Sequence, residues 1–137
     1  MRILAFDVGD RRIGIAISDP TGLIARPLTI ITRRSEPADI QAITELAHDQ
    51  KAERIIIGLP LSLDGRSGPQ AEKVRQFAAQ LTTAITMPME FRDERFSTVT
   101  AHEHRLGSGA GKKKRRAPDD DAAAAVILQS YLDETHP

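Results

Sequence analysis

The sequence predicts a single α/β domain, residues 1–137, built on a mixed five-stranded sheet with helices on both faces. Two observations predict this fold class. Three strand-like segments come first, and helical and strand-like segments then alternate to the C-terminus, which gives the order βββαβαβα. Neither an internal repeat nor a linker divides the chain. An antiparallel start followed by alternating units therefore gives one mixed sheet whose faces are covered by helices.

The first three segments predict antiparallel strands. Residues 2–9 (RILAFDVG) are apolar on both alternating faces, which is typical of a central strand covered on both sides. Residues 13–18 (IGIAIS) carry isoleucine on one face and small residues on the other, and the short GDRR connection predicts a hairpin. In residues 23–32 (LIARPLTIIT), Pro27 predicts an edge strand or an irregularity.

The rest of the chain predicts helices and strands in turn. Apolar residues recur at helical spacing in 37–50 and 69–82, and Pro37 suits the first helical turn. Short strands are expected at 54–59 and 88–93. The last part of the chain is expected to hold a helix from about Ser97, a glycine-rich basic loop at 107–116 and a final helix at 119–133.

Composition limits the classes of protein that fit. The chain of 137 residues is 40% hydrophobic and 28% charged, so it can bury a core. Without cysteine there is no disulfide framework and no thiolate metal site. No run approaches the roughly 18 apolar residues of a membrane span, and the start MRILAFD lacks the features of a signal peptide. We therefore expect a soluble cytoplasmic protein without a membrane partner.

Positive charge is concentrated in one segment, although the formal net charge is zero. A neutral total argues mildly against nucleic-acid binding, since binders usually carry a basic footprint. The run KKKRR at 112–116 follows a flexible GSGAG and can lie along a phosphate backbone, or it can be a solvated loop. Its members are Lys112, Lys113, Lys114, Arg115 and Arg116. Arg11, Arg12 and Arg95 adjoin acidic candidates and can orient a phosphate or balance those acids.

Acidic residues fall at the ends of the expected elements. Asp7 lies within an apolar strand, where an ionised carboxylate needs a partner or a metal. Asp93 and Glu94 end the last strand, and aspartates 119–121 open the last helix. The first strand is expected at the centre of the sheet, with the last strand and the last helix beside it, so these carboxylates can converge. Carboxylate oxygens suit Mg²⁺ or Mn²⁺, and two such ions about 4 Å apart support phosphodiester cleavage.

The residue pattern leaves two choices open within this acidic set. Adjacent side chains of a strand point to opposite faces, so only one of Asp93 and Glu94 can join the aspartate of the first strand. In the last helix, Asp120 and Asp121 flank the apolar stripe nearly equally, while Asp119 points away and suits an N-cap. The pattern does not separate the members of either pair.

Four segments together resemble the motif blocks of the YqgF/RuvX family. They are FDVGDRRIGIAISD, IIIGLPLSLDG, DERFST and DDDAAAAVILQSYLD, in this order and over essentially the whole chain. Members of this family are described as Holliday junction resolvases and as nucleases of pre-16S ribosomal RNA, with a ribonuclease H-like fold. The resemblance implies Asp7, Glu94 and Asp120 as catalytic acids and metal ligands, Mg²⁺ or Mn²⁺ as cofactor, and a structured nucleic acid as substrate.

The function that the resemblance implies is metal-dependent hydrolysis of phosphodiester bonds, in the processing of the precursor of 16S ribosomal RNA. Cleavage of a four-way DNA junction is the alternative. It would use the same residues, and a resolvase is expected to be a homodimer with two sites a set distance apart. We therefore expect either a monomer or a homodimer that binds structured RNA or branched DNA.

Two other classes of function compete with a nuclease. A nucleic-acid-binding or regulatory module without turnover is favoured by one departure from better-characterised resolvases of this fold, which carry an acid on the fourth strand. Here that strand reads RIIIGLPL, and Glu94 has to substitute from the fifth strand. An actin-like phosphotransferase is disfavoured, because 137 residues hold one such domain and no second half that would close over a nucleotide.

Overall fold

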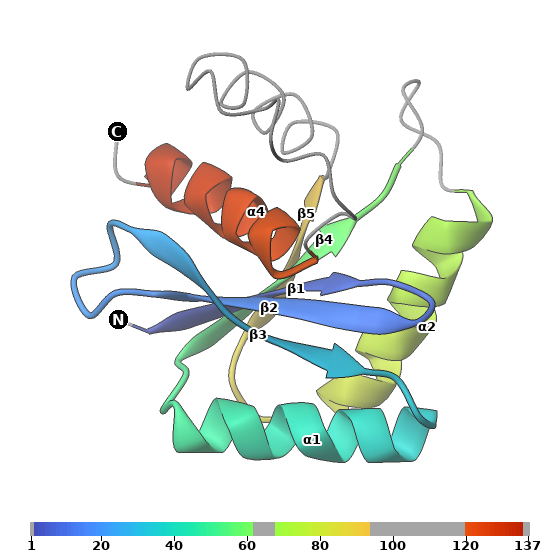
Figure 1. Ribbon diagram of the computed structural model, residues 1–137. Coiled ribbons are helices and arrows are strands. Elements are labelled where there is room, and N and C mark those ends of the chain that lie inside the picture. Colours follow the sequence, from blue (N-terminus) through green and yellow to red (C-terminus); the bar gives the residue numbers. More distant parts are fainter. Residues whose placement is uncertain (1, 62–67, 94–119, 136–137) are drawn as a thin grey trace.

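The predicted mixed sheet of five strands is present, with helices on both faces (Figure 1). The computed structural model describes residues 2–61, 68–93 and 120–135. The elements in these ranges are β1 (Ile3–Val8), β2 (Arg12–Ser18), β3 (Ala25–Thr32), α1 (Glu36–Asp49), β4 (Arg54–Leu59), α2 (Pro69–Thr82), β5 (Met89–Asp93) and α4 (Asp120–Thr135). Helix α4 covers one face of the sheet, and α1 and α2 cover the other (Figure 1).

Strand β1 lies at the centre of the sheet, whose order is β3-β2-β1-β4-β5. Its alternate residues enter two separate cores. Leu4, Phe6 and Val8 join the larger cluster, which includes residues of α1 and α2. Ile3 and Ala5 join a second cluster with residues of α4. The apolar character of both alternating faces therefore predicted the central position of this strand correctly.

Strands β1 and β2 form the predicted antiparallel hairpin, with Val8 opposite Ile13 and Leu4 opposite Ile17. The isoleucines of β2 face the larger core, and Ala16 belongs to the cluster beneath α4. The period-two pattern of this segment thus separated the two faces correctly. Small residues on the α4 side allow the helix to pack close to the strand.

Strand β3 is an edge strand and also carries an irregularity, so both alternatives raised by Pro27 are confirmed. The register with β2 shifts between Ile15 and Ala16, which pair with Thr29 and Pro27. Leu28 is therefore an extra residue in β3, as in a β-bulge. Proline has no N–H to donate to a ladder, and an edge strand with a bulge accommodates it.

The sequence led us to expect the last strand beside the first, and this expectation is wrong: β5 does not pair with β1. Strand β4 lies between them, because it pairs in parallel with β1 on one side and with β5 on the other. Strand β2 occupies the second edge of β1, so no edge of β1 is left for β5. The last helix does contact β1, as expected.

The remaining boundaries agree with expectation to within a few residues, and α4 extends to Thr135. The helix expected from about Ser97 and the loop at 107–116 lie outside the described residues. In the ranges that the structure describes, no helix is both long enough and apolar enough to span a membrane.

Helix α1 ends in a Schellman motif with Lys51 in the left-handed region, at φ 56°. The backbone N–H of Lys51 donates to the carbonyl of His48 at 3.1 Å, and that of Ala52 donates to Ala47 at 2.9 Å. A residue with a Cβ is strained in this conformation, and glycine is the usual residue there.

Replacing Lys51 by glycine is expected to raise the free energy of unfolding by about 1 kcal/mol, because it removes this strain. Urea denaturation of the wild type and the variant measures the change. Lys51→Ala is the control, since it removes the charged side chain but keeps the Cβ, and no comparable gain is expected from it. An equal gain in both variants would show that the side chain, and not the backbone strain, is responsible.

Candidate active site

Asp7 lies near the end of the central strand β1, on the face that carries α4. Its chain neighbours Phe6 and Val8 enter the core on the opposite side, so the alternation of the strand turns Asp7 toward the α4 face. The side chain of Asp7 is half-buried. The expectation of a carboxylate within an otherwise buried strand is confirmed.

The strands on both sides of β1 place glycine next to Asp7. In β2, Gly14 lies opposite Asp7 in the antiparallel register. In β4, Ile57 lies beside Phe6, so the parallel register brings Gly58 beside Asp7 one residue later. Because glycine has no side chain, neither adjoining strand covers the carboxylate of Asp7 from the side.

Helix α4 begins at the end of β1 that carries Asp7. Ala124 of α4 and Ala5 of β1 belong to the same core cluster, and the two elements are in contact. Later in the helix, the Gln129 side chain accepts a hydrogen bond from the backbone N–H of residue 25 at 2.8 Å, next to the start of β1. The helix therefore runs back along β1, and Asp120 is its first residue, one turn before Ala124 (Figure 1).

Of the two acids at the end of β5, Asp93 lies on the other face of the sheet. The register between β4 and β5 pairs Asp93 with Leu59, and Leu59 belongs to the core formed with α1 and α2. Asp93 therefore does not share the face of Asp7. Glu94 lies outside the described residues.

Two of the predicted phosphate-binding residues lie close to Asp7 in the fold. Arg12 begins β2 and shares the face of Asp7, by the alternation of that strand. Arg11 precedes it in the turn between β1 and β2, and both side chains are exposed. The other predicted contacts, Arg95 and the basic run 112–116, lie outside the part of the chain that the structure describes.

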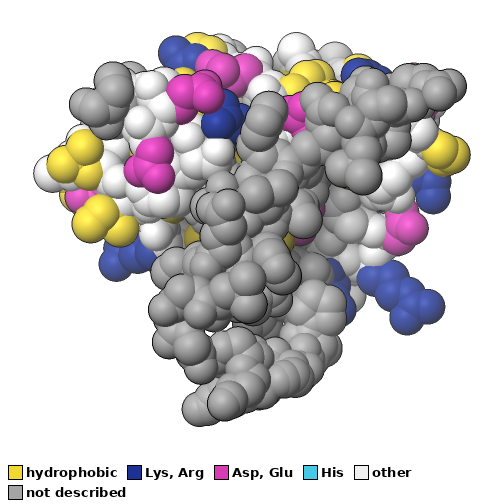
Figure 2. Space-filling model, turned by 90° about the horizontal axis from the view of Figure 1, so that it is seen from above, with side chains coloured by type: hydrophobic (Ala, Val, Ile, Leu, Met, Phe, Trp, Pro, Cys, Tyr) yellow, Lys and Arg dark blue, Asp and Glu magenta, His cyan; other side chains and the backbone are white. Residues whose placement is uncertain are grey.

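The described part of the α4 side shows mixed charge. In Figure 2, which views the molecule from above, the visible Lys and Arg side chains of the described residues are dispersed among Asp and Glu side chains. The formal charges of the whole chain also balance to zero. On the described part of this side, attraction of a phosphate backbone therefore has to come from individual arginines and not from a continuous basic patch.

Arg92 of β5 lies on the same face of the sheet as Asp7, two strands away, with Gly58 of β4 between them. The sequence did not single out Arg92 as a functional residue. The register pairs Arg92 with Gly58. Its guanidinium donates to Ser130 Oγ at 2.7 Å and to the Glu134 carboxylate at 2.7 Å. The hydrogen bond from Arg92 to Glu134, followed by the positive charge of Arg92, lowers the pKa of Glu134 below its ordinary value. Arg92 thus ties the edge strand β5 to the second half of α4.

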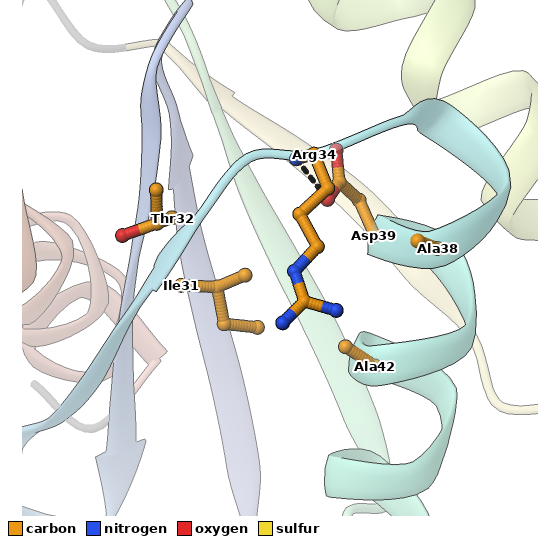
Figure 3. Close-up of a pocket in the computed structure, with 6 residues that line it drawn as sticks. All are labelled: Ile31, Thr32, Arg34, Ala38, Asp39 and Ala42. Carbon is orange, nitrogen blue, oxygen red and sulfur yellow. Dashed lines mark hydrogen bonds between the residues drawn. The ribbon is translucent and has the colours of Figure 1, made fainter.

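A pocket of about 310 Å³ lies at the outer edge of the sheet, between β3 and α1 (Figure 3). It is lined by Ile31, Thr32, Arg34, Ala38, Asp39 and Ala42. In Figure 3 the side chain of Arg34 extends along the pocket, while its backbone N–H donates to Asp39 at 3.1 Å. None of the predicted acids lines this pocket, so it is not the predicted metal site.

The chemistry of the predicted acids fits a divalent cation. In residues 2–61, 68–93 and 120–135, no three His, Cys, Asp or Glu side chains come together as a metal site. Asp7 is the predicted ligand whose side chain is described, and its half-buried carboxylate supplies the hard oxygen donors that Mg²⁺ and Mn²⁺ prefer. The side chains of Asp120 and Asp121 lie outside the described part.

Comparison with known proteins places this chain in a family. A family model described as "RuvX: Holliday junction resolvase" matches residues 1–134. A protein of Dehalococcoides mccartyi named "Putative pre-16S rRNA nuclease" is 45% identical over 130 residues, which cover 95% of this chain and 96% of that protein. A protein of the same name from Moorella thermoacetica is 44% identical over 133 residues, covering 97% of this chain and 95% of that protein.

Solved structures of resolvases share the fold. T. thermophilus RuvC, in complex with a Holliday junction substrate, has a TM-score of 0.71 at 13% identity, covering 99% of this chain and 95% of that chain. The Fowlpox virus resolvase, in complex with Holliday junction DNA, has a TM-score of 0.58 at 13% identity and covers 100% of both chains. These similarities confirm the ribonuclease H-like fold. The chain belongs to the RuvX family, and at the level of that family the nuclease predicted from its motifs is confirmed.

Proposed function

We propose that this chain is a nuclease dependent on Mg²⁺ or Mn²⁺ that hydrolyses phosphodiester bonds in the precursor of 16S ribosomal RNA. The observation that carries the proposal is the position of Asp7. Its half-buried carboxylate lies at the end of the central strand, between two glycine-bearing strands and near the start of α4. Gly14 and Gly58 flank it on the same face of the sheet, so the positions beside Asp7 in the neighbouring strands carry no side chain.

In this proposal Asp7, Glu94 and Asp120 hold the cation. When bound, the cation supplies activation of water and stabilisation of the charge that develops on the phosphate. Asp7 is held in place by the central strand, and Asp120 by the first turn of α4. Asp93 has no part in this set, because it belongs to the other face of the sheet. That leaves Glu94 as the ligand from the last strand.

The arginines beside Asp7 bind the substrate in this proposal. Arg12 shares the face of Asp7, and Arg11 lies in the adjoining turn. A guanidinium binds phosphate oxygens through two parallel hydrogen bonds, so these residues can orient the backbone over the acids. Arg95 and the basic run 112–116 extend the same contacts along the chain of phosphates.

The choice of substrate is supported by the name of the relatives, which are called pre-16S rRNA nucleases and match nearly the full length of the chain. A four-way DNA junction is the second candidate, which the description of the family model favours. The two substrates make different demands on assembly, because symmetric cleavage of a junction needs two sites and hence a homodimer.

Asp7→Asn is expected to lower the rate of cleavage by about 100-fold or more, because an amide is a poor ligand for a divalent cation. The measurement is cleavage of labelled pre-16S RNA, single-stranded RNA and a four-way DNA junction at low salt, with Mn²⁺ or Mg²⁺ and with EDTA. EDTA is expected to abolish cleavage by the wild type. Asp49→Asn is the matched control, since Asp49 is exposed and lies at the end of α1, away from the turn that follows Asp7.

The outcomes separate the candidate functions. Preference for pre-16S RNA supports the proposal, and preference for the junction, together with a dimer in solution, would assign the second function. Equal cleavage by the Asp7→Asn variant would contradict the acidic site. If the folded wild type binds these nucleic acids but cuts none of them, a binding module without turnover is the better description.

Arg12→Gln is expected to raise KM by about 3- to 10-fold, because one phosphate contact is lost. The slope of the logarithm of the binding constant against the logarithm of the salt concentration is expected to become shallower by about 1. The Michaelis constant and the binding constant are measured over a series of salt concentrations. Arg26→Gln is the control, because Arg26 is also exposed but lies at the opposite end of the β2–β3 ladder. An equal effect of the two substitutions would show that Arg12 has no special place in substrate binding.

A further inference from the structure

The turn that follows Asp7 is closed by its own backbone and held by Arg33 from the end of β3. The N–H of Gly9 donates to the carbonyl of Arg12 at 2.9 Å. Arg33 then contacts the turn twice. Its Nη1 donates to the carbonyl of Gly9 at 3.0 Å, and its backbone N–H donates to the carbonyl of Arg11 at 2.9 Å.

The turn requires glycine at position 9. A Cβ at this position would lie 2.9 Å from the carbonyl oxygen of Arg12, which is closer than real Cβ contacts. A displacement of the turn would also move its two ends, which are the end of β1 next to Asp7 and the start of β2 at Arg12. By holding the turn, the contacts of Arg33 therefore help to hold both Asp7 and Arg12 in position.

Arg33 is itself held by two further contacts. Its Nε donates to Asp39 Oδ2 at 3.1 Å, and its guanidinium lies over the ring of Phe77 in α2, 5.0 Å from the centroid. Asp39 is buried, with its side chain 3% exposed, and its second oxygen accepts the N–H of Arg34 at 3.1 Å. The guanidinium thus bridges the turn, α1 and α2 from a single position.

This ion pair joins a buried carboxylate to a partly exposed guanidinium, and it contributes little net stability because desolvation of the Asp39 charge offsets much of the attraction. What it does provide is a defined geometry, since the guanidinium of Arg33 donates from separate nitrogens in fixed directions. Among the described residues, the fully buried polar side chains are Ser18 and Asp39, so Asp39 is the buried charge of this part of the chain.

We infer that Arg33 is a positioning residue for the candidate active site, which it serves by holding the turn between Asp7 and Arg12. The inference rests on the proposed function. Arg33 does not touch the substrate in this account. It sets the distance between the acid that holds the cation and the arginine that binds the phosphate, and errors of about 1 Å in such a distance can lower a rate severely.

The test is Arg33→Lys compared with Arg54→Lys. Lysine keeps the charge of Arg33, but its single nitrogen cannot replace the separate bonds to Asp39 and Gly9. Arg54 is the matched control because it is similarly exposed, at 32% against 23%, and also pairs with a carboxylate, that of Glu90. It lies at the other end of the sheet from Asp7, beside Ile3.

Two readouts are needed, at a temperature at which circular dichroism shows both variants folded. The first is the steady-state cleavage of the substrate that the wild type prefers. Arg33→Lys is expected to lower kcat by about 10-fold with KM within about 2-fold of the wild type, and Arg54→Lys is expected to change neither. The second readout is hydrogen exchange of the backbone amides at positions 9 and 33. It is expected to be faster in Arg33→Lys than in the wild type, and unchanged in Arg54→Lys.

The results distinguish the inference from the proposed function. A wild-type kcat in Arg33→Lys overturns the inference while the nuclease proposal stands. A fall in kcat without faster exchange at the turn, or an equal fall in Arg54→Lys, also overturns it. If the wild type cleaves no substrate and Asp7→Asn is indistinguishable from it, the proposed function itself is wrong and the inference falls with it.

Discussion

The central position of β1 in the sheet is the constraint on which the candidate site depends. A strand with a neighbour on each side and helices over both faces has almost no place for a charged side chain. Phe6 fills one core and Ala5 fills the other. Asp7 avoids full burial because Ala5 is the last residue of β1 in the cluster beneath α4, and because Gly14 and Gly58 flank the next position on that face. Packing of the sheet thus leaves the carboxylate of Asp7 half-buried near the beginning of α4.

Polar contacts around this position hold the elements that build the site. Gln129 joins α4 to the β2–β3 hairpin, and Arg92 joins the second half of α4 to β5. On the other face, Arg33 connects the turn after β1 to Asp39 of α1 and to Phe77 of α2. Each of these contacts joins segments that are distant in the sequence or lie on different elements. The apolar cores determine which elements pack together, and these directional bonds determine how they are aligned at the end of β1.

Local patterns predicted the elements and the faces of the first strands, because the periods of strands and helices are properties of short segments. They could not predict strand register. Whether Asp93 or Glu94 shares the face of Asp7 depends on the pairing of β5 with β4, and that pairing places Asp93 on the opposite face. Gly14 was visible as a small residue in an alternating strand, but Gly58 becomes its counterpart only through the parallel register. The contacts of Arg33 were equally inaccessible, since they join three separate elements.

Binding of a divalent cation at Asp7 is the central claim about this protein. Crystals soaked with Mn²⁺ test this directly, because the anomalous signal of manganese locates the ion without reference to activity. The expected result is an anomalous peak within coordination distance of a carboxylate oxygen of Asp7, with Glu94 and Asp120 as further ligands. A well-ordered Asp7 without a peak beside it, or a cation bound only by other residues, would contradict the account.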